Sequence, residues 1–557
     1  MNWCGGNKGY KTIWEYDSQI VREMNTQRAG IFLTDIFVVN VFTVWKILRK
    51  MKRSIFNLIV LISLLTGGFI SCNRQQKPEA SRPNILFFLV DDLGWEDTSV
   101  PFWHDSVENN RYLRTPHIAR LAAEGMKFTN AYASSPVCSP TRTALMTGMN
   151  PARTHITNWI PGRGNHPADD QRLLIPHWRI NGLDKRNVTL PELLKAAGYT
   201  TVHIGKAHLG KKDSPGADPR HLGFDYSIAA SYRGSPGSYY VPYGRIHGPD
   251  SQMIDLEEFF PDSLYLNDAL TIMALRMLDT LAGHPEKPFY FNMWHYAVHA
   301  PIQGDPKRLE KYRLPGKTEA QVQYASMVES VDNSFGRIMK KLDELGMAGN
   351  TIVIFWSDNG GLVSHSGPPT TNYPLCSGKG SSREGGYREP LIIRWPGKVK
   401  EGTVCSVPVI ADDFFPTVLS MAGIPVPDTL RPLLDGTDIT PLLLQTGDIQ
   451  RPHPPVWHYP HYWGWKALRE ADSTITPFSA IREGDWKLIY TYEKGRCELY
   501  NLAEDIGEQH NLAGAKPEIT QRLCKDLHDV LQGMGAQTPI CRETGKALDL
   551  PHFSGSQ

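Results

Sequence analysis

The sequence predicts an α/β fold in which a large, mixed but mainly parallel sheet lies between helices, followed by a smaller antiparallel sheet with one helix. Two observations lead to this prediction. Continuous apolar runs, which are typical of strands buried on both faces, alternate along most of the chain with helical stretches. From about residue 450 the pattern changes to short alternating segments separated by turn residues.

The composition is that of an ordinary globular protein. The chain has 557 residues, of which 41% are hydrophobic and 21% charged. Because 59 Lys and Arg residues nearly balance 58 Asp and Glu residues, the net charge is only +1 and no nucleic-acid partner is indicated. The eight cysteines are scattered without a Cys-x-x-Cys pair, so we expect no disulfide framework. One or two disulfides among the later four cysteines stay an open alternative.

An export signal is expected at residues 51–71, where a basic start leads into an apolar run that ends in small residues before Cys72. This layout resembles that of bacterial lipoproteins. We expect cleavage before Cys72 and acylation of its thiol, which would anchor the mature chain to a membrane in the periplasm or outer membrane of a Gram-negative-type bacterium. The alternative is an uncleaved anchor helix.

The segment upstream of this signal is difficult to assign. An export signal normally begins a chain, and Met51 is well placed to do so, which makes residues 1–50 a doubtful extension. Residues 72–82 are polar and contain two prolines, so we expect them to form a tether. The main domain is then predicted over residues 83–449 and the C-terminal subdomain over residues 450–557.

The elements follow from these patterns in chain order. The strands of the main domain are predicted at residues 84–90, 200–206, 288–294, 351–356 and 390–395. Helical stretches are predicted within residues 115–125, 190–198 and 328–346. In the subdomain, residues 479–502 alternate like antiparallel strands with a turn at residues 493–495, and a helix follows at residues 517–534.

Acidic and amide side chains follow two of the predicted strands. Asp91 and Asp92 come directly after the first strand, and Asp358 and Asn359 follow the strand at 351–356. In parallel α/β sheets, ligands bind beyond the carboxyl ends of the strands. Either pair alone is better explained by a helix N-cap or an Asx turn. Together, three carboxylates and an amide predict a hard cation, Ca²⁺ first and Mg²⁺ as the alternative.

Basic residues also follow the predicted strands. Lys206 and His208 lie in GKAHLG, His299 in VHAP, and Lys379 in the glycine-rich segment CSGKGSSREGG. Each of them alone would usually be a solvated surface residue. Four such residues beside a metal cluster predict a pocket for an anion.

The segment SSPVCSPTRTALMTG contains the most specific motif, since Cys138 to Arg142 fit the pattern C-x-P-x-R. On this motif, residues 83 to about 515 resemble the type I, arylsulfatase-like sulfatases of the alkaline phosphatase-like superfamily. The resemblance implies the predicted fold and the hydrolysis of sulfate esters. It also implies that a maturase oxidises Cys138 to formylglycine, whose hydrate is the nucleophile.

The resemblance also implies a role for each matching residue. Asp91, Asp92, Asp358 and Asn359 would bind the metal together with the modified Cys138. Arg142 would brace the formylglycine, Lys206 would contact the sulfate, and His208 would assist the formylglycine hydroxyl during sulfate release. His299 and Lys379 would contact the sulfate and the leaving oxygen, with His299 the first choice of general acid. Ala207 departs from the family pattern, which commonly has tryptophan there.

The substrate implied by the resemblance is a sulfated carbohydrate, such as a glycosaminoglycan or a fragment of a sulfated polysaccharide. The segment VWHYPHYWGW at residues 456–465 concentrates aromatic and histidine residues, and we take His461 as a substrate-binding candidate. A buried interdomain core explains this segment equally well. Three other functions stay open: a phosphoesterase or phosphonate hydrolase of the same superfamily, a hydrolase with an unmodified thiol, and a non-catalytic glycan-binding lipoprotein.

Overall fold

The structure is a computed structural model, which describes residues 82–162, 171–244, 255–363, 367–464 and 466–553. The predictions for residues 1–50, for the export signal at 51–71 and for Cys72 lie outside these residues. The chain from Ser81 to Gln557 forms one compact unit that contains both predicted sheets. None of the helices described is long and apolar enough to cross a membrane.

The predicted large sheet is confirmed, and it has eight strands within the described ranges. In spatial order these are β10 (Thr403–Cys405), β2 (Met126–Phe128), β9 (Leu391–Arg394), β8 (Thr351–Ser357), β1 (Asn84–Val90), β7 (Phe289–Trp294), β5 (Thr200–Gly205) and β6 (Tyr226–Ile228). Of these strands, β9 runs antiparallel to both its neighbours, and the other strand pairs are parallel. The sheet is therefore mixed but mainly parallel.

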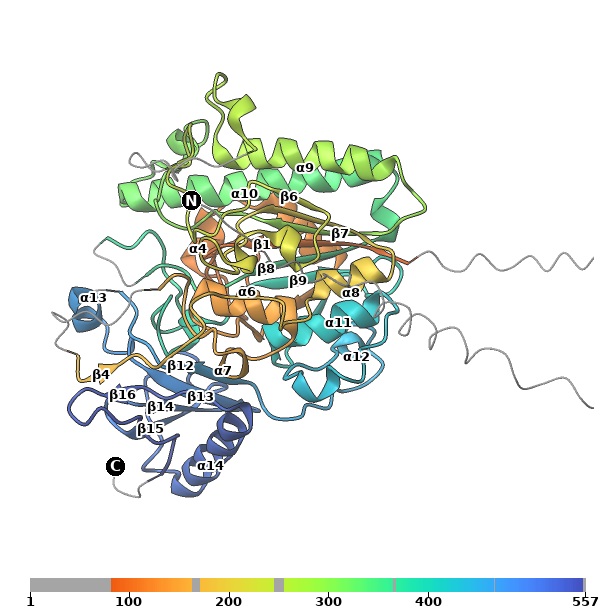
Figure 1. The fold of residues 1–557 in the computed structure, drawn as a ribbon. Helices are drawn as coiled ribbons and strands as arrows, with labels where there is room; N and C mark the ends of the chain where they lie inside the picture. The colour runs from red at the N-terminus through yellow and green to blue at the C-terminus, as the bar shows by residue number, and fades with distance from the viewer. Residues whose placement is uncertain (1–81, 163–170, 245–254, 364–366, 465, 554–557) are drawn as a thin grey trace, which may run out of the picture. The chain divides into compact units, whose positions relative to one another are not determined.

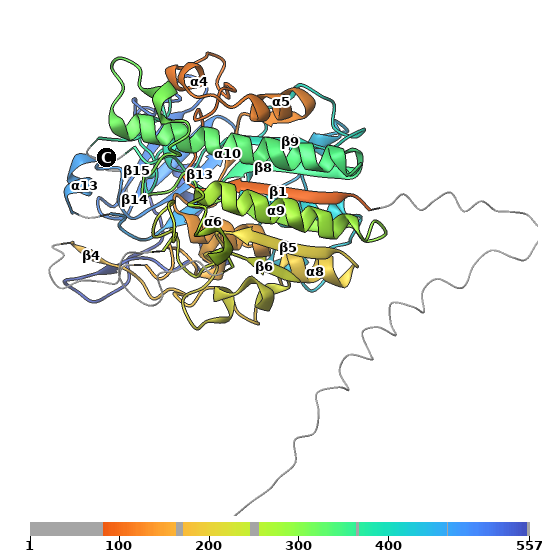
Figure 2. The ribbon, with the colours of Figure 1, turned by 90° about the horizontal axis from the view of Figure 1, so that it is seen from above.

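Helices cover both faces of this sheet (Figures 1 and 2). The helices of the described chain are α4 (Glu108–Tyr112), α5 (Pro116–Glu124), α6 (Cys138–Thr147), α7 (Pro151–Thr154), α8 (Leu190–Ala196), α9 (Leu266–Ala282), α10 (Glu319–Glu344), α11 (Phe414–Met421), α12 (Thr440–Leu443), α13 (Lys466–Ala471) and α14 (Pro517–Met534). Helix α10 begins earlier than predicted, because Thr318 and Gln321 form a capping box at its start.

The alternation of side chains along β1 explains the two layers. Leu86, Phe88 and Val90 pack in one core with residues of α5, α9 and α10. The intervening residues Ile85, Phe87 and Leu89 pack in a second core with residues of α6, α8, α11 and α12. A strand with both faces buried in this way must be apolar throughout, as the sequence of β1 is.

The predicted C-terminal sheet and helix are also confirmed. The sheet is antiparallel, in the order β12 (Val456–Tyr459), β13 (Phe478–Glu483), β14 (Trp486–Thr491) and β15 (Arg496–Asn501). Helix α14 packs on it through a shared core. Cys497 and Cys524, from β15 and α14, lie with their sulfur atoms 3.4 Å apart as thiols. Short two-residue strands pair as β11 (Val409–Ile410) with β3 (Ala131–Tyr132), and as β16 (Ile540–Cys541) with β4 (Leu173–Leu174).

Candidate active site

Three carboxylates meet at the carboxyl ends of the neighbouring strands β1 and β8. Oxygen atoms of Asp91, Asp92 and Asp358 all lie within 4.8 Å of one another, and the three side chains are buried. Asp92 has a positive φ of 61°, a strained conformation for a non-glycine residue that turns the chain sharply after the strand. The predicted convergence of these residues is therefore present in the structure.

The electrostatics of the three carboxylates show how strongly they interact. Burial, together with the charge of Asp358, raises the pKa of Asp91 well above its usual value. Burial would also raise the pKa of Asp92, but the ammonium of Lys379 and the ring of His299 hold that pKa well below its usual value. Asp91 is therefore the carboxylate of the three that most readily binds a proton.

The unpartnered oxygens in this cluster fit a hard cation. The side-chain oxygens Asp91 Oδ1 and Asn359 Oδ1 are buried and accept no hydrogen bond among the described residues. The amide nitrogen of Asn359 donates to Asp92 Oδ1 at 2.7 Å, which leaves the amide oxygen available as a ligand. Carboxylate and amide oxygens are the ligands that Ca²⁺ and Mg²⁺ prefer. The residues present therefore suit the predicted cation.

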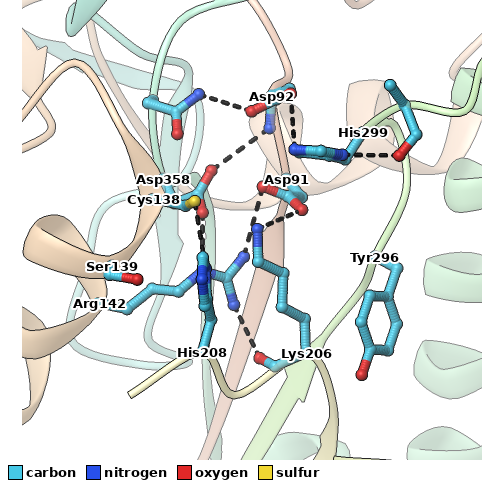
Figure 3. Close-up of polar contacts among 12 residues, drawn as sticks. Asp91, Asp92, Cys138, Ser139, Arg142, Lys206, His208, Tyr296, His299 and Asp358 are labelled. Atoms are coloured by element: carbon cyan, nitrogen blue, oxygen red, sulfur yellow. Dashed lines mark hydrogen bonds and ion pairs between the residues drawn. The ribbon is translucent and has the colours of Figure 1, made fainter. Parts of the chain in front are cut away.

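Cys138 is the first residue of α6 and is only 3% exposed. Pro140 lies in the first turn of this helix, where its missing N–H removes no helical hydrogen bond. The Sγ atom of Cys138 lies 3.2 Å from Nδ1 of His208 and beside Asp358 (Figure 3). Burial raises the pKa of the thiol, so the residue is not an activated thiolate. This disfavours the hydrolase with an unmodified thiol.

Arg142 connects the helix to both strand ends. Its Nε donates to Asp358 Oδ2 at 2.7 Å and its Nη1 to the backbone oxygen of Lys206 at 2.7 Å, as Figure 3 shows. Its Nη2 lies 3.7 Å from Asp91 Oδ1. The guanidinium also lies over the ring of Trp294, at 5.2 Å from the ring centre. Because this buried guanidinium bonds to Asp358 after β8 and to Lys206 after β5, it fixes α6, and hence Cys138, relative to the carboxylates.

Lys206 and His208 follow β5, as predicted. Nζ of Lys206 donates to Asp91 Oδ2 at 2.6 Å. Burial, and then the charge of Lys206, lowers the pKa of His208 well below its usual value, so its imidazole is neutral. His208 has a φ of 56°, and a Cβ at Gly234 would lie 2.3 Å from its ring. Glycine at position 234 therefore leaves the space that the ring occupies.

Lys379 and His299 approach the cluster from the side of Asp92. Nζ of Lys379 donates to both carboxylate oxygens of Asp92, at 2.6 and 2.8 Å. Nε2 of His299 lies 3.7 Å from Asp92 Oδ2, and its side chain is 20% exposed. Burial, with the neighbouring charge of Lys379, lowers the pKa of His299 to about 3. The structure thus brings both predicted leaving-group residues to one carboxylate.

Ala207 and His461 both lie inside the molecule. Ala207, the departure from the family pattern, is buried. His461 is also buried: its Nε2 shares a hydrogen bond of 2.8 Å with Thr157, and its ring packs edge-on against Trp178. These contacts are those of a packed core, the alternative interpretation of this segment. The substrate-binding role of His461 stays a prediction.

Sequence reasoning missed two residues near the site. One is Gly234, described above. The other is Glu389, which is buried with no partner for either carboxylate oxygen among the described residues. Burial, together with the charge of Asp358, raises its pKa well above the usual value. Neither residue follows the carboxyl end of a predicted strand. Glu389 directly precedes the strand predicted at 390–395, and this amino end reaches the site only because β9 runs antiparallel to β8.

Profiles of known protein families match most of the folded chain. Residues 83–424 match the profile of a family described as Sulfatase. Residues 379–537 match a second profile, described as N-sulphoglucosamine sulphohydrolase, C-terminal.

Individual relatives agree with these profiles. The N-acetylgalactosamine-6-sulfatase of Rattus norvegicus is 36% identical over 488 residues, which cover 82% of this chain and 86% of the relative. A sulfatase of Formosa agariphila is 29% identical over 520 residues, covering 84% of this chain and 91% of the relative.

Solved structures share the fold. Ps i-CgsB, described in complex with k-i-k-neocarrahexaose, matches with a TM-score of 0.65 and 27% identity over 81% of this chain and 93% of that chain. A phosphonate monoester hydrolase of Agrobacterium radiobacter matches with a TM-score of 0.56 over 83% of this chain and 97% of its own. At 19% identity, that second likeness shows the fold alone.

Proposed function

Because the chain belongs to the sulfatase family, we propose that it hydrolyses sulfate esters of a carbohydrate, using a formylglycine made from Cys138 and one divalent cation. The single observation that carries this proposal is the position of Cys138, at the start of α6 between His208 and the three-aspartate cluster. The hydrolysis of sulfate esters is the activity of the family. The bound cation, the formylglycine and the carbohydrate substrate are proposals for this chain.

The pocket suits a sulfate ester because its charges match those of the substrate. A sulfate ester resists attack on sulfur until its negative oxygens are neutralised. Lys206 and Lys379 supply two fixed positive charges, and each donates to a carboxylate of the cluster. The N-terminus of α6 adds the positive end of a helix dipole next to Cys138. These groups bind the sulfate and hold its sulfur near residue 138.

The cation would be held by Asp91, Asp92, Asp358 and Asn359. When bound, a divalent cation would act as a Lewis acid that polarises the sulfate oxygens. Within the chain itself, Arg142 keeps Asp358 oriented and Lys206 keeps Asp91 oriented, through the hydrogen bonds described above. We propose Ca²⁺, with Mg²⁺ as the alternative, because all four side chains offer oxygen ligands.

The modification explains why a cysteine is used where no activated thiolate exists. The hydrate of formylglycine would supply one oxygen to attack sulfur while the bond from sulfur to the alcohol oxygen breaks, and a second hydroxyl whose loss of a proton would re-form the aldehyde and release sulfate. His208 is neutral and faces residue 138 through Nδ1, so it is placed to accept that proton. On the other side, His299 and Lys379 face Asp92 and are the candidates to protonate the leaving oxygen.

The substrate that we propose is a sulfated glycan fragment. The 36% identical rat relative is named N-acetylgalactosamine-6-sulfatase, and Ps i-CgsB is described in complex with k-i-k-neocarrahexaose. We expect sulfate release from one or more members of a panel of sulfated mono- and oligosaccharides, measured by ion chromatography. The same panel should include aryl phosphate and phosphonate esters. Faster turnover of those esters would contradict the proposal, and binding without turnover would favour a non-catalytic glycan-binding protein.

We also propose that the protein is exported and lipidated at Cys72. The basis is the sequence layout at residues 51–72, and the test is Cys72→Ala. The variant has no thiol to acylate, so it should move from the membrane fraction to the soluble fraction. It loses the membrane affinity of the acyl chain, which is about 0.8 kcal/mol per buried methylene group. Cys541→Ala is the matched control and should stay with the membrane. Unchanged membrane association of Cys72→Ala would show that the lipid anchor is wrong.

A further inference from the structure

The loop that carries Lys379 contacts both the main domain and the C-terminal subdomain. We define the Lys379 loop as residues 376–388, which include the short 3₁₀ helix η6 (Glu384–Gly386). Two backbone hydrogen bonds join it to the segment that follows β8: the N–H of Lys379 donates to the oxygen of Gly361 at 3.1 Å, and the N–H of Gly360 donates to the oxygen of Gly386 at 3.0 Å. The N–H of Gly380 also donates to the oxygen of Pro136 at 2.9 Å, so the main domain holds part of the loop.

The C-terminal subdomain supplies further contacts to this loop. The N–H of Ser382 donates to the backbone oxygen of Thr474 at 3.1 Å, and Ser381 and Thr474 share a hydroxyl hydrogen bond of 2.7 Å. Arg383 donates to Glu498 of β15 at 2.7 Å, and its guanidinium lies 4.7 Å from the ring centre of Tyr500. The loop is thus tied along its length to the C-terminal subdomain.

At the centre of this interface lies a buried group of charges. Nζ of Lys487, on β14, donates to Glu384 Oε1 at 2.9 Å and to Glu508 Oε1 at 2.8 Å, and all three side chains are fully buried. The second oxygen of Glu508 accepts from the N–H of Glu384 at 2.7 Å. Tyr132 and Arg388 also donate to Glu384. Glu384 lies five residues from Lys379, so these bonds fix the end of the loop.

Buried ion pairs rarely add much to stability over apolar packing, because desolvation offsets their attraction, and in some proteins their role is to fix geometry. We propose that Lys487, Glu384 and Glu508 form a positioning cluster that holds Lys379 against Asp92, so that one buried cluster of the C-terminal subdomain positions a catalytic residue of the main domain. The proposal rests on the proposed function of Lys379 in binding sulfate. The three residues act through the loop and do not touch substrate.

The first test is a double-mutant cycle. Lys487→Met should lower kcat/KM by roughly 10- to 100-fold in otherwise unmodified protein, since small misplacements of a catalytic group have effects of this size. In protein that already carries Lys379→Ala, the same change should have little further effect, because the group it positions is gone. Equal losses in both backgrounds would overturn the proposal, since they would indicate general damage to the fold.

A milder variant covers the case in which Lys487→Met does not fold. Arg383→Met removes one tie of the same loop at a site that is 12% exposed, and it should show the same non-additivity with Lys379→Ala. Arg522→Met, which removes an exposed pair with Glu483 in the same subdomain, is the matched control and should leave kcat/KM unchanged. A loss in Arg522→Met as large as that in Arg383→Met would contradict the proposal.

The second test does not depend on sulfatase activity. Hydrogen exchange should accelerate in peptides covering residues 376–388 of Lys487→Met and Arg383→Met, while peptides of β1 and β8 stay protected. If the unmodified protein hydrolyses no sulfate ester, the proposed function fails, and this exchange measurement still decides whether the cluster orders the loop. Unchanged exchange in that segment would overturn the positioning role, whatever the activity.

Discussion

Cys138→Ala is expected to reduce sulfate release by at least about 10³-fold, the scale of loss seen when a catalytic nucleophile is removed. The physical reason is that turnover requires two oxygens on one carbon of residue 138, and alanine supplies neither. Mass spectrometry of the peptide around residue 138 should show the aldehyde, which is lighter than the thiol. The specific activity of different preparations should rise in proportion to their converted fraction.

Two comparisons make this result specific. Cys541→Ala removes a half-buried thiol far along the chain from the motif, and it should keep full activity. Cys138→Ala should retain its fold, because Arg142 still joins α6 to Asp358 and to the backbone of Lys206. Full activity in protein whose residue 138 is an unmodified thiol would overturn the mechanism, even if the products were alcohol and sulfate.

The strand ends and their residues could be predicted because they depend on local patterns. A strand such as β1 that is buried on both faces is apolar throughout, so its end is marked by the first charged residues, Asp91 and Asp92. The same rule located Asp358 and Asn359 after β8, and Lys206 after β5. Parallel pairing of β1 with β8 and β7 then places their carboxyl ends side by side.

Long-range relations could not be predicted in this way. Nothing in the local pattern of Lys487 indicates that it lies inside the molecule, since a lysine in an alternating strand is usually exposed. Its burial becomes comprehensible only when β14 is packed on the loop that contains Glu384, about a hundred residues earlier in the chain. For the same reason the antiparallel direction of β9, in a sheet whose other neighbours are parallel, was not evident from its apolar sequence.

Asp91→Asn is expected to lose the bound cation and to lower activity by at least about 10²-fold, because it removes a ligand charge and weakens the hold on Lys206. Metal analysis of the unmodified protein should find one Ca²⁺ per chain, and of the variant substantially less. Asp332→Asn is the matched control. Asp332 is a buried aspartate of α10 that accepts hydrogen bonds from the start of α5, so its replacement should leave the metal content unchanged.

Removal of the cation should also make stability depend on pH in a definite direction. Chelation should lower the Tm of the unmodified protein, since a ligand present at 100 times its Kd stabilises the folded state by about 2.7 kcal/mol. Without the cation, the folded-state pKa of Asp91 lies above its unfolded value, because of burial and the charge of Asp358. The folded state therefore binds the extra proton, and the stability that this proton contributes is present at low pH and is lost as the pH rises through the raised pKa. The fall in Tm on chelation should consequently grow with pH. The Tm of metal-free Asp91→Asn, which has no carboxyl to titrate there, should depend less on pH than the Tm of the chelated unmodified protein. Zinc in the purified protein, or two metal ions per chain, would contradict the single hard-cation site and favour a phosphoesterase-type centre.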